Sequence, residues 1–218
     1  IPGELPVDIL KNKKLKIGFD PKLFTKKSLN IFFGKTDCQY IPLSENLIDK
    51  IWIRKKNIFK NKFYKLPNSS IGEDYKLKLN KIILELKKNK ADFKFITASE
   101  NNAWLLNIRG SDSKYTPIPY SYILIDRKKN INFYCNLNKI SSSFKKKFNN
   151  IKFNNINLIS KSLKEINGKK FIIDSSTCSL YFENIILMNN KIHNYKDSIY
   201  FLKAIKTKKE IKNIKKAH

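Results

Sequence analysis

Residues 103–126, with the sequence AWLLNIRGSDSKYTPIPYSYILID, decide the fold of this chain. Two apolar runs flank a turn that contains Gly110, Pro117 and Pro119. Proline has no amide hydrogen for a strand ladder, so these prolines interrupt pairing until the second run resumes it. The stretch contains one lysine, Lys114, although the formal net charge of the chain is +27. Because an unpaired charge is costly to bury, we predict that this stretch passes through the centre of a sheet.

The surrounding pattern is an alternation of helices and strands. Residues 71–91 carry apolar side chains on one helical face, residues 92–98 are rich in strand-forming types, and residues 121–136 suit a hairpin. The other elements expected in this part of the chain are helices at 98–106, 138–150, 161–167 and around 180–185 and from 198 onward, and strands at 151–160, 169–176 and 192–195. This order predicts an α/β fold with a mixed sheet flanked by helices.

The first 52 residues continue the same alternation on a smaller scale. A short helix near Pro6, a buried strand at 14–20, a helix at 21–34 closed by Gly34, and a strand followed by a helical turn at 38–52 are expected. Since a domain usually has about 100–200 residues, the 218 residues hold one complete domain and additional segments.

The positive charge comes almost entirely from lysine, because the chain has only three arginines among its 45 basic residues. The guanidinium group makes the bidentate contacts to phosphate and guanine that are typical of specific nucleic-acid binding. The lysines are spread over the whole length and accompany many asparagines and isoleucines, all encoded by A/T-rich codons. We therefore interpret most lysines as solvated surface residues and expect no nucleic-acid partner.

The cysteines and histidines predict neither a disulfide framework nor a metal site. Cys38, Cys135 and Cys178 are widely separated, and the two histidines are His193 and His218. We expect the cysteines to be small buried residues in a reducing compartment. The sequence has no glycine-rich phosphate loop and no HExxH motif. It also has no apolar run of about 20 residues, so it suggests no membrane span.

Arg109 is the residue in the opening stretch that packing does not explain. One interpretation is a structural ion pair with Asp112 across the turn, and the other is an arginine that points from the sheet into a neighbouring cleft. Trp104 is expected in the core. Asp112 follows Ser111, but no histidine lies nearby in the sequence, so a hydrolytic triad is not predicted.

Three stretches, in order, resemble the cytosolic three-domain Xaa-Pro aminopeptidases (aminopeptidase P) of the creatinase/aminopeptidase P family. The opening stretch is similar to AWLFNLRGSDVPYNPVFFSYAIV. Residues 41–56 (IPLSENLIDKIWIRKK) are similar to VPVENNLVDxIWxDRP, and residues 201–218 (FLKAIKTKKEIKNIKKAH) to LKAIKNxxEIxGxRxAHIRDG. The chain departs from the family patterns at Lys114, Thr116 and Lys55, where proline, asparagine and proline are common.

The resemblance implies a creatinase N-terminal-like domain preceded by the tail of a similar domain. The implied parts are the C-terminal part of the first creatinase-like domain (1–56), a linker (57–70), the second creatinase-like domain (71–203) and the first helix of the catalytic pita-bread domain (204–218). Since the chain begins at Ile1 and not at methionine, we expect that an earlier segment precedes it.

The resemblance also implies a function for the whole protein. Family members are metallopeptidases that remove the N-terminal residue from short peptides whose second residue is proline. Two divalent metal ions, expected to be manganese, bind to two Asp, two Glu and one His of the third domain, and this chain contains none of those ligands. A cytoplasmic homodimer is expected.

In this framework the chain supplies no catalytic residue and no metal ligand, and alone it is expected to be inactive. Its expected role is to shape the active-site cleft and to form interdomain or dimer contacts. The match of NIRGSD implies that Arg109, Asn107 and Asp112 face the cleft. Two other hypotheses are a free-standing creatinase-like binding module without catalysis and a lysine-rich nucleic-acid-binding protein.

Overall fold

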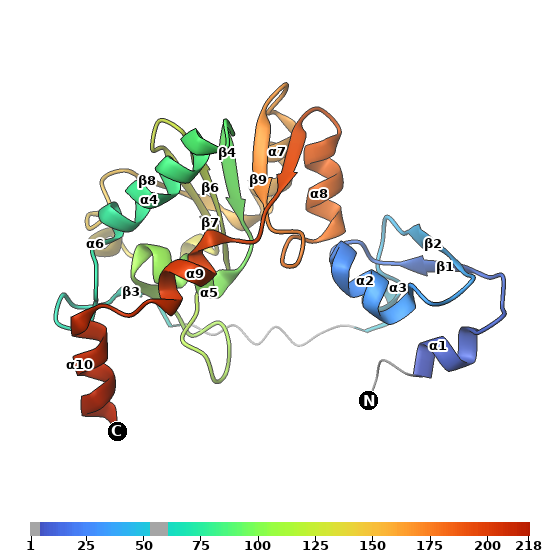
Figure 1. Ribbon diagram of the computed structural model, residues 1–218, viewed down its shortest axis with the longest axis horizontal. Helices are drawn as coiled ribbons and strands as arrows, with labels where there is room; N and C mark the ends of the chain where they lie inside the picture. Colours follow the sequence, from blue (N-terminus) through green and yellow to red (C-terminus); the bar gives the residue numbers. More distant parts are fainter. Residues whose placement is uncertain (1–4, 53–60) are drawn as a thin grey trace. The chain divides into compact units, whose positions relative to one another are not determined.

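The computed structural model describes residues 5–52 and 61–218, which form two compact units (Figure 1). The smaller unit comprises the described residues up to 52 together with 175–185. The larger unit comprises residues 61–174 and 186–218. No helix in the described part of the chain is long and apolar enough to cross a membrane.

The smaller unit contains two parallel strands, three helices before residue 53 and the first part of α8 (Leu180–Leu187). Its elements before residue 53 are α1 (Leu5–Leu10), β1 (Lys16–Phe19), α2 (Lys26–Phe33), β2 (Gln39–Pro42) and α3 (Leu47–Ile51). Thr25 caps α2 through a capping box with Ser28, and Asn46 caps α3. The strand expected at 14–20 is present as β1, but its predicted burial is wrong, because the residues of β1 alternate between exposed and half-buried.

The rest of the chain provides a larger set of elements. They are β3 (Tyr64–Lys65), α4 (Tyr75–Lys88), β4 (Phe93–Ile96), α5 (Ser99–Leu106), β5 (Ile108–Arg109), β6 (Ser121–Asp126), β7 (Ile131–Cys135), η1 (Leu137–Lys139), α6 (Ser142–Lys145), β8 (Ile151–Asn155), η2 (Ile156–Leu158), α7 (Ile159–Lys164), β9 (Lys170–Ile173), α8 (Leu180–Leu187), β10 (Lys191–Asn194), α9 (Ser198–Ala204) and α10 (Lys208–Ala217).

Six of these strands form a mixed sheet in the order β10-β9-β4-β6-β7-β8. Only β6 runs antiparallel to its neighbours, β4 and β7, and the other adjacent pairs are parallel. The predicted α/β class with a mixed sheet is confirmed. Residues 103–126 do reach the middle of this sheet through β6, while their first part forms the second half of α5 and the short strand β5, which pairs with β3 in a separate ladder.

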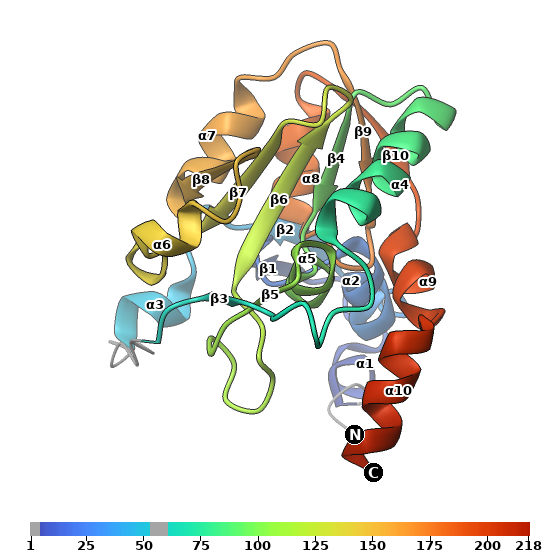
Figure 2. The same ribbon diagram turned by 90° about the vertical axis from the view of Figure 1, so that its left-hand side faces the viewer.

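The sheet is covered on both faces (Figure 2). Because successive side chains of a strand point to opposite faces, Ile123 and Ile125 of β6 join the core cluster that includes Ile82 and Leu86 of α4. On the other face, the hydroxyl of Tyr134 in β7 bonds with Ser162 of α7. The sheet is thus buried from both sides, which suits its mainly parallel pairing.

Three local predictions differ from the structure. The helix expected at 138–150 is replaced by η1 and the short α6, which Ser141 caps. The helix expected from 198 onward is interrupted at 205–207, where Thr207 begins a second helix. The residue preceding α5 is Ala98, and no side chain caps this helix, although Ser99 or Asn101 was expected to do so.

Candidate functional site

The three predicted cleft residues, Asn107, Arg109 and Asp112, lie where α5 ends and β5 begins. α5 stops after Leu106 because Asn107 adopts a left-handed backbone conformation, with φ 56° and ψ 34°. Asparagine tolerates this conformation better than most residues, and it commonly terminates helices in this way. The chain then turns into the two residues of β5.

The Asn107 side chain joins the end of α5 to the start of α4. Its Oδ1 accepts a hydrogen bond from Lys78 Nζ at 2.6 Å, and its Nδ2 donates to the carbonyl of Glu73 at 3.0 Å. Asn107 is 3% exposed. Both ends of its amide group are therefore bonded inside the larger unit, and the residue fixes the turn.

Lys78 is a buried cation beside this turn. It is 2% exposed, its Nζ donates to the carbonyl of Trp104 at 2.7 Å, and it lies 4.1 Å from the centre of the Trp104 ring. Burial lowers the pKa of Lys78 to about 8, although the negative charges of Glu210 and Glu73 act in the opposite direction. The carbonyls at a helix C-terminus and the aromatic face both attract a cation.

Arg109 also binds the end of α5. Its Nη1 donates to the carbonyl of Ala103 at 3.1 Å and to that of Ile108 at 2.9 Å. Burial lowers the pKa of its guanidinium group. The ion pair with Asp112 that the sequence suggested is wrong, because the Asp112 carboxylate has other partners.

Asp112 holds the base of the loop that follows β5. One carboxylate oxygen forms an ion pair with Lys139 of η1, and the other accepts from the amide of Tyr120 at 2.7 Å. The amides of Gly110 and Asp112 donate to the carbonyls of Pro117 and Ile118, both at 3.3 Å. The base of the loop is closed by these bonds, while its residues 114–117 are exposed.

The three candidates do not converge on one point, because each binds a different group of the larger unit. Within the described ranges, no three His, Cys, Asp or Glu side chains are grouped so as to hold a metal ion. Of the three free cysteines, Cys135 and Cys178 are buried as expected, whereas Cys38 is only half-buried. Burial raises the pKa of Cys135 to about 12, so this thiol is not a nucleophile at neutral pH.

Three lysines are buried although the sequence did not predict it: Lys78, Lys94 and Lys139. Two of them carried a signal in their position. Lys78 lies three residues after Tyr75 and four before Ile82, on the apolar face of α4, and Lys94 shares a strand face with Ile96. A lysine on an apolar stripe should therefore have been considered separately from the surface lysines.

Comparison with known proteins places these features in a wider group. Residues 54–210 match the family described as Creatinase/Prolidase N-terminal domain. Xaa-Pro aminopeptidase 1 of Dictyostelium discoideum is 30% identical over 95% of this chain and 35% of its own length. Xaa-Pro aminopeptidase ApepP of Drosophila melanogaster is 28% identical over 93% of this chain and 34% of its own length.

A solved structure has the same fold. It is the X-prolyl aminopeptidase of Caenorhabditis elegans, described as a cytosolic enzyme with a di-nuclear active site. Its TM-score is 0.83 at 21% identity, and the match covers 97% of this chain and 36% of the nematode protein. The chain therefore spans about a third of the length of the relatives that it matches.

Proposed function

The chain belongs to the creatinase/prolidase N-terminal domain family, and from this premise we propose that it is the noncatalytic part of an Xaa-Pro aminopeptidase. The observation that carries the proposal is that the similarity to Xaa-Pro aminopeptidase 1 extends over 95% of the chain, well beyond the family match at 54–210. The whole protein would hydrolyse the N-terminal Xaa-Pro bond of short peptides. The proposed parts are those that the family resemblance implies: the C-terminal part of a first creatinase-like domain (1–56), a linker (57–70), a second creatinase-like domain (71–203) and the first helix of the catalytic domain (204–218).

The metal ions of such an enzyme would be bound outside this chain. The nematode relative is described as having a di-nuclear active site. The residues that the structure describes do not fit a metal pair, because none of their His, Cys, Asp and Glu side chains form a suitable group. We propose that manganese binds elsewhere in the protein, and no chemical step is assigned to the present residues. A cytoplasmic homodimer belongs to the same proposal.

The contribution of this chain would be to shape the peptide-binding cleft. The oxygen and nitrogen of the Asn107 amide group and both carboxylate oxygens of Asp112 are bonded to other residues of the larger unit. These two residues therefore act by stabilising the turn. Arg109 differs, because its hydrogen bonds to the described residues all come from Nη1. Its Nε and Nη2 are the groups of this turn that we propose for a peptide carbonyl or carboxylate.

The test compares the 218-residue chain with a chain extended C-terminally to the length of the relatives. Both are assayed with Xaa-Pro peptides and added manganese, and only the extended chain is expected to cleave. A well-folded extended chain without peptidase activity would contradict the enzyme proposal and favour a binding module. Retention on heparin at physiological salt would favour the nucleic-acid hypothesis instead.

Arg109 is tested in the extended chain once activity is present. Arg109→Ala is expected to lower kcat/KM by about 10- to 100-fold, because a charged hydrogen bond to the peptide is lost. Arg109→Lys keeps the charge but loses the planar fork, so we expect an intermediate value. Unchanged kinetics in both variants would show that Arg109 only supports α5.

A further inference from the structure

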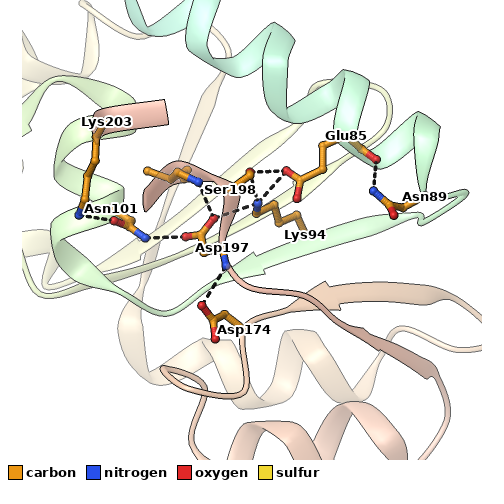
Figure 3. Close-up of polar contacts among 9 residues, drawn as sticks. Glu85, Asn89, Lys94, Asn101, Asp174, Asp197, Ser198 and Lys203 are labelled. Carbon is orange, nitrogen blue, oxygen red and sulfur yellow. Dashed lines mark hydrogen bonds and ion pairs between the residues drawn. The ribbon is translucent and has the colours of Figure 1, made fainter. Parts of the chain in front are cut away.

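A group of charged and polar side chains is buried between the sheet, α4 and the start of α9. We call Lys94, Glu85, Asp197 and Ser198 the Lys94 cluster (Figure 3). Lys94, in the middle of β4, is 2% exposed. Its Nζ lies 2.8 Å from Glu85 Oε2 and 2.9 Å from Asp197 Oδ1, and it donates to Ser198 Oγ at 2.9 Å. Ser198 Oγ in turn donates to Glu85 Oε2 at 2.6 Å.

Stability alone does not explain a lysine at this position. In the sheet register, Lys94 lies beside Ile125 and Ile172, which are fully buried and apolar. Replacement of a buried ion pair by well-packed apolar residues is often neutral or stabilising, because two charges no longer need to leave water. An ion pair does contribute directional hydrogen bonds, and these fix the relative orientation of the elements that carry its two charges.

Asp197 extends the cluster into a wider set of bonds around the start of α9. It caps α9 by accepting from the amide of Ile199 at 3.2 Å. Its Oδ2 accepts from Asn101 Nδ2 of α5 at 2.7 Å, and its own amide donates to Asp174 Oδ2, after β9, at 2.9 Å. Asp197 therefore connects α9 to β4 and α5 through its carboxylate and to the end of β9 through its backbone amide.

The later turn of α9 is also attached by polar groups. Lys203 Nζ donates to Asn101 Oδ1 at 2.7 Å and lies 4.4 Å from the centre of the Tyr200 ring. The Tyr200 hydroxyl donates to Glu100 Oε1 at 2.7 Å. Both ends of α9 are thus bonded to α5.

Apolar burial contributes comparatively little to this attachment. In α9 only Ile199 is fully buried, Leu202 is partly buried, and Phe201 is 69% exposed. Hydrophobic attraction is non-directional, so one buried isoleucine does not set the rotation of a helix about its axis. The polar bonds are the groups that can do so.

The next helix, α10, starts four residues after α9 ends. At the start of α10, Thr207 and Glu210 lie so close to Gly72 that a Cβ atom there would be 2.4 Å from Thr207 Oγ1. Further along, Asn213 Nδ2 donates to the carbonyl of Ser69 at 3.2 Å. α10 has no buried residue.

We propose that the Lys94 cluster is a positioning device, with Lys94 as its central positioning residue, that sets the direction in which α9 and α10 leave the sheet. The importance of this direction for peptidase activity rests on the proposed function, in which the metal-binding part follows α10. Lys94 itself touches no reacting atom in this proposal.

The experiment measures hydrogen exchange of the 218-residue chain by mass spectrometry. Lys94→Met keeps the length of the side chain and removes its charge. Ile125→Ala is the matched control, because it weakens the same core face without removing a bond to α9. We expect Lys94→Met to speed exchange in 198–217 at least tenfold relative to 121–135, and Ile125→Ala to produce no such selective change.

A milder variant covers the case in which Lys94→Met does not fold. Ser198→Ala removes only the hydroxyl that bonds Lys94 and Glu85, and about threefold faster exchange in 198–217 is expected. Unchanged exchange in this segment in the folded variants, or an equal change in Ile125→Ala, would overturn the proposal.

Kinetics of the extended chain separate this inference from the proposed function. If the unmodified extended chain cleaves Xaa-Pro peptides, Lys94→Met should lower kcat about tenfold with bound metal and KM unchanged. Selective exchange without that loss would overturn the link to activity. An inactive unmodified chain would contradict the enzyme proposal, while the exchange data would still decide the role of Lys94.

Discussion

Lysine side chains have two different roles in this chain, and composition alone does not separate them. The expectation that lysines lie on solvated faces fails for Lys78, Lys94 and Lys139, which are buried and bonded to carbonyl, amide or carboxylate oxygens. Two of these lysines bind within the lysine-poor stretch 103–126. In addition to its own Arg109 and Lys114, that stretch therefore has two buried positive charges from neighbouring elements bonded to it.

The buried Lys78 predicts a specific dependence of stability on pH. Its pKa is lowered to about 8 in the folded state, mainly by burial, so the unfolded chain binds more protons between pH 8 and about 10.5. Stability therefore rises with pH in this window, because the cost of burying the charge disappears. Relative to Lys78→Met, the free energy of unfolding of the unmodified chain should increase by about 1 kcal/mol between pH 7.5 and 9.5, after allowance for solvent screening.

Urea unfolding at the two pH values measures this difference. The comparison with Lys78→Met cancels the opposite contribution of Cys135, whose raised pKa keeps the folded thiol protonated while the unfolded thiol ionises. A difference between the two proteins that is independent of pH, or that shrinks as pH rises, would contradict the assignment of a depressed pKa to Lys78.

Substitution by alanine should destabilise the chain for different reasons at Gly110 and at Gly168. A Cβ atom at Gly110 would lie 2.9 Å from the Phe63 ring and 3.0 Å from Pro119 Cα, so Gly110→Ala should cost about 1–3 kcal/mol by overpacking. At Gly168 the Cβ would meet nothing within 4 Å, but φ is +65°, so Gly168→Ala should cost about 1 kcal/mol through backbone strain. Thermal unfolding of both variants checks the order, and a smaller loss at Gly110 would be the contrary result.

At the scale of elements, α10 depends on its ends more than on burial. Thr207 accepts from the amide of Glu210 at 3.2 Å, and Glu210 Oε2 accepts from the amide of Thr207 at 2.8 Å, which forms a capping box. Thr207→Ala should destabilise this helix by about 1 kcal/mol. Because α10 buries no residue, exchange in 208–217 should accelerate while the melting temperature stays nearly constant.

The control for α10 is the other capping box, at Thr25 in α2. Thr25→Ala removes the same kind of bond and should leave exchange in 208–217 unchanged. A fall in melting temperature on Thr207→Ala as large as that of a core substitution would mean that α10 belongs to the cooperative core.

Elements with a strong local sequence pattern were predicted correctly. The apolar stripe of α4 and the turn between β6 and β7 set those elements, because their periodicity and turn residues act over a few positions. The helix expected at 138–150 was wrong, because its serines and asparagines are weak helix formers that favour caps and turns. Local pattern also did not predict β5 and the partner of Arg109, because both depend on residues brought together by folding.

The turn that carries the three candidate residues was predicted from the sequence, but the bonds of their side chains were not. The sequence placed Asn107, Arg109 and Asp112 at one turn, and the structure finds them there. Their partners, Lys78 and Lys139, lie about 30 residues away on either side, on α4 and η1. Such distant pairs leave no local pattern in a single sequence. Only the three-dimensional structure therefore separates Asn107 and Asp112, whose side chains are bonded internally, from the half-exposed Arg109.

At the scale of the whole molecule, the two units share a local arrangement. In the smaller unit, Asp20 follows β1 and accepts from Nδ2 of Asn46, the residue that caps α3, at 2.9 Å. In the larger unit, Asp174 follows β9 and accepts from the amide of Asp197, which caps α9, at 2.9 Å. In both units an aspartate that follows a strand thus binds the residue that caps a helix, through a side-chain amide in one case and a backbone amide in the other, and the division into two creatinase-like domains stays a prediction.

The segment 8–52 of the smaller unit is much less buried than the larger unit, and this difference predicts which of the two trypsin cleaves first. Among the side chains described between 8 and 52, only Pro21 is buried, whereas the larger unit has an extensive apolar core around α4 and the sheet. Local opening should therefore require less free energy in the segment 8–52. Lysines are present in both, so the availability of cleavage sites does not set the order. We expect cleavage within 11–35 at least tenfold faster than within 76–170, as followed by mass spectrometry. In urea-unfolded chain the two regions should be cut at similar rates, and equal rates in the native chain would mean that the two units open together.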